Sequence, residues 1–471
     1  MILGDIANRI GRSARGLTGA VGETFGEPTL RLGVTGLSRA GKTVFITSLV
    51  ANLMDRGRMS QLAAAAEGRI DAAYLQPQPD DTLPRFDYEK HLAALTADAP
   101  HWPESTRAVS ELRLSMRIRP TGLLAGFQGA RRLHLDIVDY PGEWLLDLGL
   151  LEKSFEDWSR DTLARAERRE IAGDFLSRLK AEDSSQELEE ARAQALSESF
   201  TAYLRAASEA GYSDCSPGRF LLPGDLAGSP VLTFAPLPPG DGTAGRKSLR
   251  REFERRYEAY KDRVVKPFFR DHFSRIDRQI VLVDALGAIH RGPGAVEDLR
   301  HTMSDVLSAF RPGRNAFLSQ ILMGKRVERI LFAATKADHL HHRQHPHLSA
   351  FMQALTREAA DRAHFAGART DAMAIAALRA TVEETRSHRG EDLDCVRGTL
   401  TSGKSAAFYP GELPQDPQRL LGPARDGSEH WLDADYGLMT FAPAKLSLRP
   451  GEGPPHIRLD RAAQFLFGDR L

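Results

Sequence analysis

A glycine-bounded loop near the start of the chain carries the residues best suited to chemistry. The pattern G-x-x-x-x-G-K-S/T and its next residue are formed by Gly36, Leu37, Ser38, Arg39, Ala40, Gly41, Lys42, Thr43 and Val44. Glycine permits the backbone angles that point successive N–H groups at phosphate oxygens, and a following helix adds its positive dipole end. We expect Lys42 to reach the β- and γ-phosphates and the Thr43 hydroxyl to ligate Mg²⁺. The loop predicts a nucleoside-phosphate site.

An aspartate and a glycine further along the chain fit the same chemistry. Asp139 ends the apolar segment 133–139 and is followed by Tyr, Pro and Gly142, in the order D-x-x-G. A carboxylate at the end of a strand beside the phosphate loop can hold Mg²⁺ through water. The N–H of Gly142 can contact a γ-phosphate and swing away when that phosphate leaves. We therefore expect Asp139 and Gly142 at the phosphate end of the site.

A third motif indicates the base. The pattern T-K-x-D follows an apolar run and is formed by Thr335, Lys336, Ala337 and Asp338. In GTPases the aspartate of this pattern accepts guanine N1–H and the exocyclic amine, while the lysine stem covers the base. Adenine presents the opposite edge chemistry, so Asp338 would repel it. Further residues expected beside the base are His339, Ala377 and Leu378.

Three other patterns compete with these assignments. Ile280–Asp284 is also an apolar run ending in aspartate, but a Pro-Gly turn follows Asp139 and not Asp284, so we favour Asp139 for Mg²⁺. Gly398–Ser405 repeats the phosphate-loop pattern, but Pro410 forbids a normal helix after it, so we expect a hairpin loop. A histidine cluster at 339–347 has no nearby cysteine or carboxylate except Asp338, so we expect a solvent-facing or base-flanking loop rather than a metal site.

Composition narrows the class of protein. The 471 residues include 63 basic and 63 acidic side chains, a balance that argues against nonspecific nucleic-acid binding. The two cysteines, Cys215 and Cys395, are far apart and suggest no disulfide framework, which fits a reducing cytoplasm. No run has the 18 or so apolar residues of a membrane span. Residues 1–26 are amphipathic and arginine-containing, which allows either peripheral membrane contact or packing on the protein itself.

The elements that position these motifs follow from apolar periodicity. Alternating or continuous apolar runs predict strands near 30–36, 109–118, 133–139, 279–284, 329–335 and 373–377, and helical spacing begins at Val44. The second and third of these runs are joined by a short connection and predict an antiparallel pair. The fold expected is an α/β P-loop domain whose mixed six-stranded sheet contains one antiparallel strand.

Changes in composition predict the organisation of the chain. Long charged helical stretches between 150 and 275 indicate a helical lobe inserted into the nucleotide-binding domain. The segment after 380 is rich in proline and glycine and ends in an amphipathic stretch. The predicted units are an N-terminal amphipathic helix (1–26), the nucleotide-binding domain in two parts (27–149 and 276–380), the inserted helical lobe (150–275) and a C-terminal extension (381–471).

Several segments together resemble the YcjX-like family of bacterial P-loop proteins. They are GLSRAGKTVFITSLV, LDIVDYPGEWLLDL, ATKADHL, FYPGELP and PHIRLDRAAQFLFGD, and the resemblance spans nearly the whole chain. It implies a Ras-like nucleotide-binding domain with a helical insertion. It also implies a link to envelope or phage-shock-type stress and work near an inner-membrane partner protein. The family is often described as a predicted ATPase.

Carrying GTPase roles onto this chain meets two departures. Glu143 follows D-x-x-G where many GTPases have a glutamine that orients the attacking water. A carboxylate can accept a proton from water but cannot donate to the γ-phosphate oxygens, and its charge opposes theirs. The switch threonine, a further Mg²⁺ ligand, must be chosen from Ser105 and Thr106, and we choose Thr106. We therefore expect slow intrinsic hydrolysis that needs a partner.

The function expected is that of a cytoplasmic switch that binds GTP or GDP with Mg²⁺ and hydrolyses GTP slowly. The amphipathic N-terminus allows this switch to be peripheral to the inner membrane. The residues expected to take part in hydrolysis are Lys42, Thr43, Thr106, Asp139, Gly142 and Glu143, with Thr43, Thr106 and Asp139 around the metal. One alternative is an ATPase in which Asp338 is structural. Another is an interaction protein that binds nucleotide for stability and barely turns it over.

Overall fold

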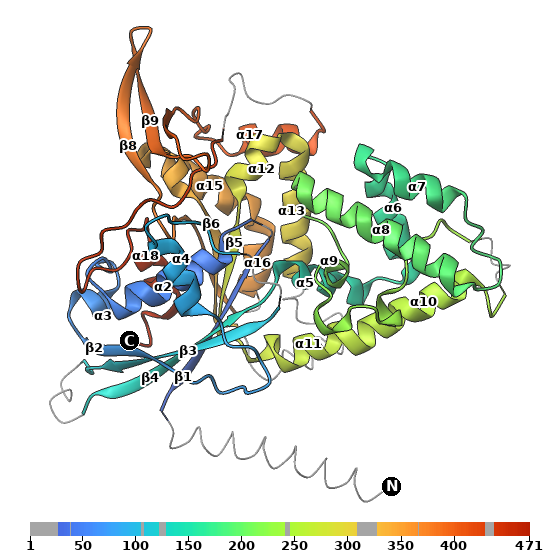
Figure 1. Cartoon of the computed structure of the whole chain (residues 1–471), viewed down its shortest axis with the longest axis horizontal. Helices are drawn as coiled ribbons and strands as arrows, with labels where there is room; N and C mark the ends of the chain where they lie inside the picture. The colour runs from blue at the N-terminus through green and yellow to red at the C-terminus, as the bar shows by residue number, and fades with distance from the viewer. Residues whose placement is uncertain are drawn as a thin grey trace, which may run out of the picture.

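A seven-stranded mixed β-sheet forms the centre of the molecule (Figure 1). This computed structural model describes residues 27–37, 39–104, 108–121, 129–240, 245–308, 327–365, 367–428 and 438–471. Across the sheet the strands are β2 (Ile70–Gln76), β3 (Ser110–Ile118), β4 (Arg131–Asp139), β1 (Thr29–Gly36), β5 (Arg278–Val283), β6 (Arg329–Ala334) and β7 (Arg369–Ala374). Among these seven, β3 alone runs against the others, since its pairs with β2 and β4 are antiparallel and the remaining pairs are parallel.

The predicted single antiparallel strand is confirmed, but the predicted count of six strands is wrong. The additional strand is β2, which pairs with β3 at the edge of the sheet. Its sequence, IDAAYLQ, buries only Ile70 fully. An edge strand with one buried side chain lacks the apolar alternation that marks a core strand, so periodicity did not reveal it.

The last strand of the sheet lies earlier in the chain than predicted. β7 covers Arg369–Ala374, whereas the apolar pattern favoured 373–377. After Ala374 the backbone stays close to the sheet, because the Ile375 N–H donates to the Ala334 carbonyl at 2.8 Å. Ala376 then pairs with Ile457 from the C-terminal part of the chain. Ile375 therefore still packs with residues of β6, and the chain pairs with the C-terminal segment from Ala376 on.

Alternate residues of the central strands face two different helical layers. Ile280 and Leu282 of β5 pack in one apolar cluster with α2 (Lys42–Met54) and α18 (Leu459–Phe467). Val281 and Val283 point to the other face and join the cluster formed with α12 (Ala285–Arg291) and α13 (Pro293–Ser308). Helix α18 is held at the sheet by Arg278, whose fully buried guanidinium donates to the Leu466 carbonyl at 2.8 Å. The C-terminal helix thus completes the core of the sheet.

All the elements described between β4 and β5 are helical, and they gather to one side of the sheet (Figure 1). They are α5 (Gly142–Leu146), α6 (Phe155–Ala166), α7 (Gly173–Lys180), α8 (Glu190–Ala210), α9 (Gly218–Leu221), α10 (Leu249–Tyr260) and α11 (Lys266–Asp271), with short 3₁₀ or π turns between them. Trp158 stacks on Tyr257 at a centroid distance of 5.1 Å within their aromatic core. That core is continuous with the apolar residues on one face of the sheet. None of the helices described combines the length and apolar character needed to cross a membrane.

The remaining elements surround the carboxyl ends of the parallel strands and the sheet edges. They are α3 (Ala63–Ala66), α4 (Tyr88–Thr96), α15 (His345–Leu355), α16 (Arg357–Phe365), β8 (Thr381–His388), β9 (Glu391–Thr399), β10 (Ser405–Phe408) and α17 (Gln418–Arg425). Strands β8 and β9 form a long projecting hairpin, and β10 pairs with β9 (Figure 1). The second phosphate-loop pattern, Gly398–Ser405, is the β9–β10 turn, as expected.

Candidate nucleotide-binding site

The glycine-bounded loop joins β1 to α2 at the carboxyl edge of the sheet. Gly41, at the N-cap of α2, has φ 78° and ψ 30°, and a Cβ added there would meet nothing within 4 Å. The left-handed backbone, rather than a lack of space, therefore favours glycine. Arg39 is also left-handed, with φ 65°. At Gly36 a Cβ would lie 3.0 Å from the Cβ of Leu282, so this end of the loop is close to β5. Ser38 lies outside the described residues.

Lys42 and Asp139 meet directly. The Lys42 ammonium lies 2.7 Å from Asp139 Oδ1, and the Asp139 side chain is 1% exposed. Apart from this ion pair, neither carboxylate oxygen accepts a hydrogen bond within the described part of the chain. Buried carboxylate oxygens are normally satisfied, so this pair of oxygens is suited to the water shell of a hard cation. Thr43 is buried at the start of α2. These residues fit a magnesium ion with its hydration shell; Thr106, the third predicted ligand, lies outside the described residues.

Gly142 packs against the phosphate loop without any intervening side chain. A Cβ placed on Gly142 would lie 2.3 Å from the Gly36 carbonyl oxygen and 3.0 Å from the Leu37 nitrogen. Such contacts are too close for any side chain, so the residue must be glycine for this approach. The D-x-x-G backbone and the start of the phosphate loop are thus in contact.

Glu143 lies partly buried next to this contact. Its side chain lines a small cavity together with Leu37 and Arg39 of the loop, and with Asp284 and Arg291 on the side of α12. Burial raises the pKa of the Glu143 carboxyl, while the nearby Lys42 ammonium lowers it. The balance favours the protonated acid more than in water. Glu143 is therefore a titratable side chain beside the phosphate loop.

Asp284, the competing Mg²⁺ ligand, has structural partners. Its Oδ1 accepts the Gly287 N–H at 3.0 Å and caps α12. Its Oδ2 lies 2.6 Å from the Lys336 ammonium. Among the residues that the structure describes, Asp139 has no comparable set of donors. The geometry therefore favours Asp139 over Asp284 for the metal and gives Asp284 the positioning of Lys336.

The T-K-x-D segment follows β6 at the same edge of the sheet. The Thr335 N–H donates to the Val283 carbonyl at 2.9 Å, which fixes the segment beside β5. Lys336 is left-handed, with φ 61°, and its side chain extends to Asp284. Asp338 is buried, and its Oδ2 accepts the Ala380 N–H at 2.8 Å. This bond fixes the orientation of the carboxylate that the sequence assigns to the base.

A backbone group that the sequence did not indicate contacts Asp338. The Ala380 N–H donates to the Asp338 carboxylate, a few residues after Ala377 and Leu378, which the sequence predicts beside the base. Leu378 is buried, and Ala377 is partly buried, just after the bridge that Ala376 makes to Ile457. Sequence reasoning missed Ala380 because the loop length between the strand and the contact depends on where β7 ends.

His339 lies directly beyond the aspartate. Its ring packs edge-on against Phe441 at a centroid distance of 5.2 Å. Burial lowers the pKa of His339, which favours the neutral ring. The Nδ1 atom has no hydrogen-bond partner within the described residues. The side chain is thus a neutral, partly buried ring at the border between the base-side loop and the C-terminal segment.

Helices inserted between β4 and β5 touch the D-x-x-G segment, which the sequence did not reveal. A Cβ on Gly218 would lie 2.1 Å from the Glu143 carbonyl oxygen, so this backbone too is in direct contact. The Arg219 guanidinium stacks over the Trp144 ring at 3.2 Å. On the opposite side, the Arg39 guanidinium of the phosphate loop donates to the Glu209 carbonyl at the end of α8. The inserted helices therefore contact both motifs at the phosphate end.

A buried aspartate joins the same segment to the helices. Asp147 Oδ1 accepts the Gly218 N–H at 2.8 Å, and its Oδ2 accepts the Tyr260 hydroxyl at 2.5 Å. Burial raises the pKa of Asp147 to about 7, although these hydrogen bonds and Arg219 lower it. The carboxyl thus changes charge near neutral pH in the folded protein.

Replacing Asp147 by asparagine should change how stability depends on pH. An aspartate in the unfolded chain has a pKa of about 3.9, so between pH 4 and 7 the folded state binds more protons than the unfolded state. The contribution of Asp147 to the free energy of unfolding of the wild type therefore falls as the pH rises through this window. Asparagine cannot ionise, so Asp147→Asn should gain on the order of 2 kcal/mol relative to wild type between pH 5 and pH 8.

Urea denaturation at pH 5 and pH 8 measures this difference. Glu111, whose pKa burial also raises to about 7, contributes equally to both proteins. The exposed Asp174 supplies the control, because Asp174→Asn should give no relative gain. A stability difference between wild type and Asp147→Asn that is the same at both pH values would contradict the assignment.

The histidine cluster has carboxylate neighbours that the sequence concealed. Glu383 of β8 and Asp394 of β9 both lie 3.6 Å from the ring of His341. The expectation that only Asp338 would be near the cluster is therefore wrong. The physical reason is the β8–β9 hairpin, which folds back against the segment after Asp338.

Comparison with known proteins identifies the family of the chain. The model of the YcjX-like family, DUF463, matches residues 30–471. The chain belongs to the YcjX-like family. It is similar to a protein of Escherichia coli (strain K12) named "Ras-like GTPase YcjX", with 38% identity covering 94% of this chain and 96% of the relative. It is also 36% identical to a protein of the same name from Shewanella oneidensis, covering 94% of each chain.

In this YcjX-like chain, the structure brings three predicted motifs to one edge of the sheet. The phosphate loop follows β1, Asp139 ends β4, and Thr335 follows β6. The parallel strands β4, β1, β5 and β6 are neighbours, so their carboxyl ends lie side by side. This is the edge at which open α/β sheets bind ligands.

Proposed function

We propose that this protein binds GTP together with Mg²⁺, hydrolyses it slowly and works as a nucleotide-dependent switch. The observation that carries the proposal is the direct contact of Gly142 with Gly36, beside the Lys42–Asp139 ion pair. It places a D-x-x-G backbone at the phosphate loop. The name "Ras-like GTPase" of two relatives supports the same chemistry.

The guanine preference rests on Asp338. Its Oδ2 is fixed by the Ala380 N–H, and the carboxylate offers acceptors alone. Guanine presents two adjacent donors, N1–H and the exocyclic amine, whereas adenine presents an acceptor at N1. A buried carboxylate oxygen that faces that acceptor would receive no hydrogen bond from the base, which costs binding energy. Lys336, directed by Asp284, would then lie along the base with its stem.

The hydrolysis step follows from the phosphate end of the site. A water molecule attacks the γ-phosphorus, the bond to the β–γ bridging oxygen breaks, and GDP and inorganic phosphate leave. The loop N–H groups and Lys42 stabilise the charge that develops on the phosphate oxygens. Thr43, and Asp139 through water, would hold a magnesium ion, which would supply further positive charge there. When nucleotide is bound, the Lys42 ammonium has to break its ion pair with Asp139 in order to contact the phosphates.

Slow turnover is proposed because of Glu143. An ionised carboxylate beside the γ-phosphate repels it and donates no hydrogen bond to it. The burial that raises the pKa of Glu143 lessens this repulsion by favouring the neutral acid. The side chain still lacks the amide group with which a glutamine donates to the phosphate while accepting from the attacking water.

The switch role rests on an unbroken run of backbone contacts. Gly36 touches Gly142, and the next residue, Glu143, touches Gly218 of the inserted helices. No side chain separates these backbones. If Gly142 moves when the γ-phosphate is lost, Glu143 would move with it and displace Gly218 at the start of α9. We propose that the helices of 150–275 form a lobe that reads the nucleotide state in this way. The stress-response role and an inner-membrane partner are proposed from the family resemblance alone.

Phosphate release by the purified protein tests the proposed activity. With Mg²⁺ present, we expect GTP turnover below about 0.01 s⁻¹, in the range of unassisted switch GTPases, and ATP turnover lower still. Lys42→Ala is the control. It removes the positive charge that would contact the phosphate oxygens, so phosphate release should be abolished. Turnover that is unchanged in Lys42→Ala, or faster with ATP than with GTP, would contradict the proposal.

A further inference from the structure

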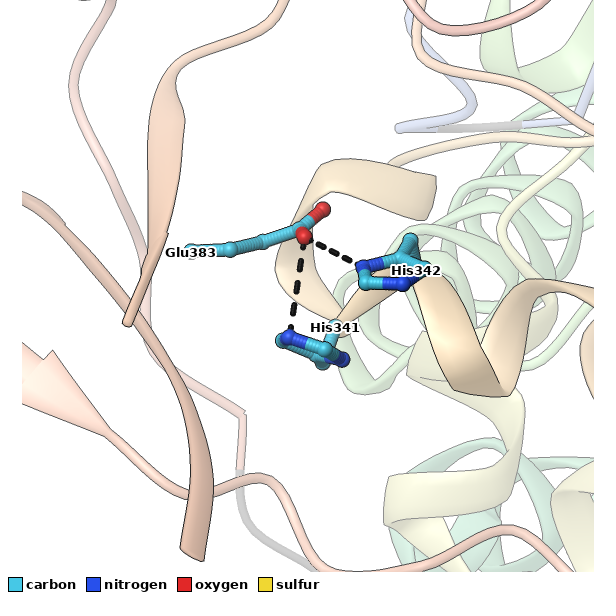
Figure 2. Close-up of side chains that lie close together, drawn as sticks. All are labelled: His341, His342 and Glu383. Carbon is cyan, nitrogen blue, oxygen red and sulfur yellow. Dashed lines mark hydrogen bonds and ion pairs between the residues drawn. The ribbon is translucent and has the colours of Figure 1, made fainter. Parts of the chain in front are cut away.

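Two consecutive histidines and a glutamate meet a few residues beyond Asp338 (Figure 2). Glu383 Oε2 lies 3.6 Å from His341 Nε2 and 2.6 Å from His342 Nδ1. These three atoms all lie within 4.8 Å of one another. The histidines come from the segment before α15, and the glutamate comes from β8. The group therefore joins two segments that are distant in the sequence.

Burial distinguishes this group from a surface ion pair. The His341 side chain is 8% exposed, and its Nδ1 has no hydrogen-bond partner within the described residues. Buried ring nitrogens are usually satisfied, so this atom calls for an explanation. Glu383 is 22% exposed, whereas His342 is 63% exposed. The group thus has a buried anchor and an open side through which an ion can enter.

A second carboxylate stands behind the buried histidine. Asp394 Oδ2 lies 3.6 Å from His341 Nδ1, on the ring nitrogen that does not face Glu383. Histidines that bind metals usually donate their second ring N–H to a carboxylate, which fixes the tautomer and makes the ligand nitrogen more basic. A small movement of Asp394 would create this bond and satisfy the unpartnered Nδ1.

Two arginines also face the group, and their positions leave the ligand atoms accessible. Arg379 lies 3.4 Å from Glu383 Oε1, which is not the oxygen shared by the histidines. Arg343 lies 3.0 Å from Asp394 Oδ2, and its side chain is 72% exposed. Both guanidiniums therefore balance the carboxylates from the outside. They reduce the affinity for a cation, but their ion-pair partners are Glu383 Oε1 and Asp394 Oδ2 rather than the ligand atom Glu383 Oε2.

We propose that His341 Nε2, His342 Nδ1 and Glu383 Oε2 bind a divalent transition-metal ion of the zinc class. Zinc binds imidazole nitrogen and carboxylate oxygen at about 2.0–2.2 Å, so tetrahedral ligand atoms stand about 3.4 Å apart. The His341–Glu383 separation already matches, and the exposed His342 has to move out by about 1 Å. Water would fill the fourth position, because three protein ligands leave one open. Two imidazoles and one carboxylate favour zinc over magnesium or calcium.

The ion would strengthen a connection that the protein already makes. The Asp338 carboxylate accepts the Ala380 N–H, and the metal would join His341 to Glu383, each three residues further along its segment. It would hold β8 against the loop that orients the Asp338 carboxylate. This part rests on the proposed function, since it predicts that the ion tightens GDP binding, by about three- to ten-fold, through positioning of Asp338.

The experiment uses the untagged full-length chain, treated with a chelator and dialysed, with no nucleotide present. Titration with Zn²⁺ against a chromogenic chelator should show one ion per chain, and Co²⁺ in its place should give the visible spectrum of a tetrahedral site. His341→Ala and Glu383→Gln should each weaken Zn²⁺ binding at least about ten-fold. His388→Ala, which removes an exposed histidine of the same hairpin, should leave it unchanged within about two-fold.

The outcomes distinguish a failure of the metal-site proposal from a failure of the proposed nucleotide-binding function. Binding below one ion per chain, or binding that His341→Ala and His388→Ala weaken equally, would overturn the metal site and leave a network of ion pairs. If Zn²⁺ binds as expected, GDP titration with and without Zn²⁺ tests the coupling. Absence of GDP binding in both conditions would contradict the proposed function, and equal GDP affinity in both would overturn the coupling.

Discussion

GTP turnover should fall at least about 100-fold when Gly142 is replaced by alanine, while GDP affinity changes less than about ten-fold. The new methyl group would stand 2.3 Å from the Gly36 carbonyl oxygen, so the two backbones must separate. The Gly142 N–H then no longer reaches the γ-phosphate. GDP has no γ-phosphate and depends less on this contact. Single-turnover phosphate release and GDP calorimetry on the same preparation measure the two effects.

A second glycine provides the control for this substitution. Gly294 lies in helix α13, and a Cβ there would meet nothing within 4 Å. Gly294→Ala should therefore leave turnover unchanged and stabilise the helix slightly. If Gly142→Ala hydrolyses GTP as fast as Gly294→Ala, the contact between D-x-x-G and the phosphate loop has no role in hydrolysis.

Asp338→Asn should reduce GDP affinity about 100-fold or more and introduce affinity for xanthosine diphosphate. The carboxamide can keep the Ala380 N–H on its oxygen, which leaves its NH₂ group toward the base. This NH₂ donor would face the exocyclic amine of guanine, which is also a donor, and no hydrogen bond would form. Xanthine carries a carbonyl at the same position, which can accept a hydrogen bond from the NH₂ group. Calorimetric titration of both nucleotides into wild type and variant measures the exchange.

The matched control is Asp371→Asn in β7, which alters an exposed carboxylate on the neighbouring strand. It should bind GDP as the wild type does. Unaltered GDP affinity in Asp338→Asn would show that Asp338 only supports Ala380. Weak binding of both nucleotides with loss of the folded state would be recognised by thermal denaturation, and Asp338→Glu, which keeps the acceptors, then tests the same point.

The sequence predicted those parts of the fold whose apolar pattern is local. Strand β1, the phosphate loop and α2 follow from alternating and helical spacing within one short stretch. The antiparallel pair β3–β4 follows from two apolar runs with a short connection. Strand β2 escaped because six of its seven residues are not fully buried, so no apolar face marks it. Edge strands are often of this kind, since one of their sides has no partner strand.

The motif residues were predictable, but their partners were not. Lys42, Asp139 and Asp338 belong to short sequence motifs, and their residue types indicate which groups they can bind. Gly218 stands in a stretch without any motif, and its contact with Glu143 depends on how α9 is placed. Ala380 depends on the end of β7, and Glu383 depends on the fold of a hairpin. Contacts of this kind arise from tertiary packing, which a single sequence does not display.

The most direct test of the account is calorimetric titration of the wild-type protein with GDP and with ADP, each with Mg²⁺. A guanine site built on Asp338 and a phosphate site built on Gly36–Thr43 predict one GDP per chain. They also predict that ADP binds at least about 100-fold more weakly. ADP binding as tight as GDP binding, or tighter, would contradict the guanine site and leave an adenine-nucleotide protein in which Asp338 is structural.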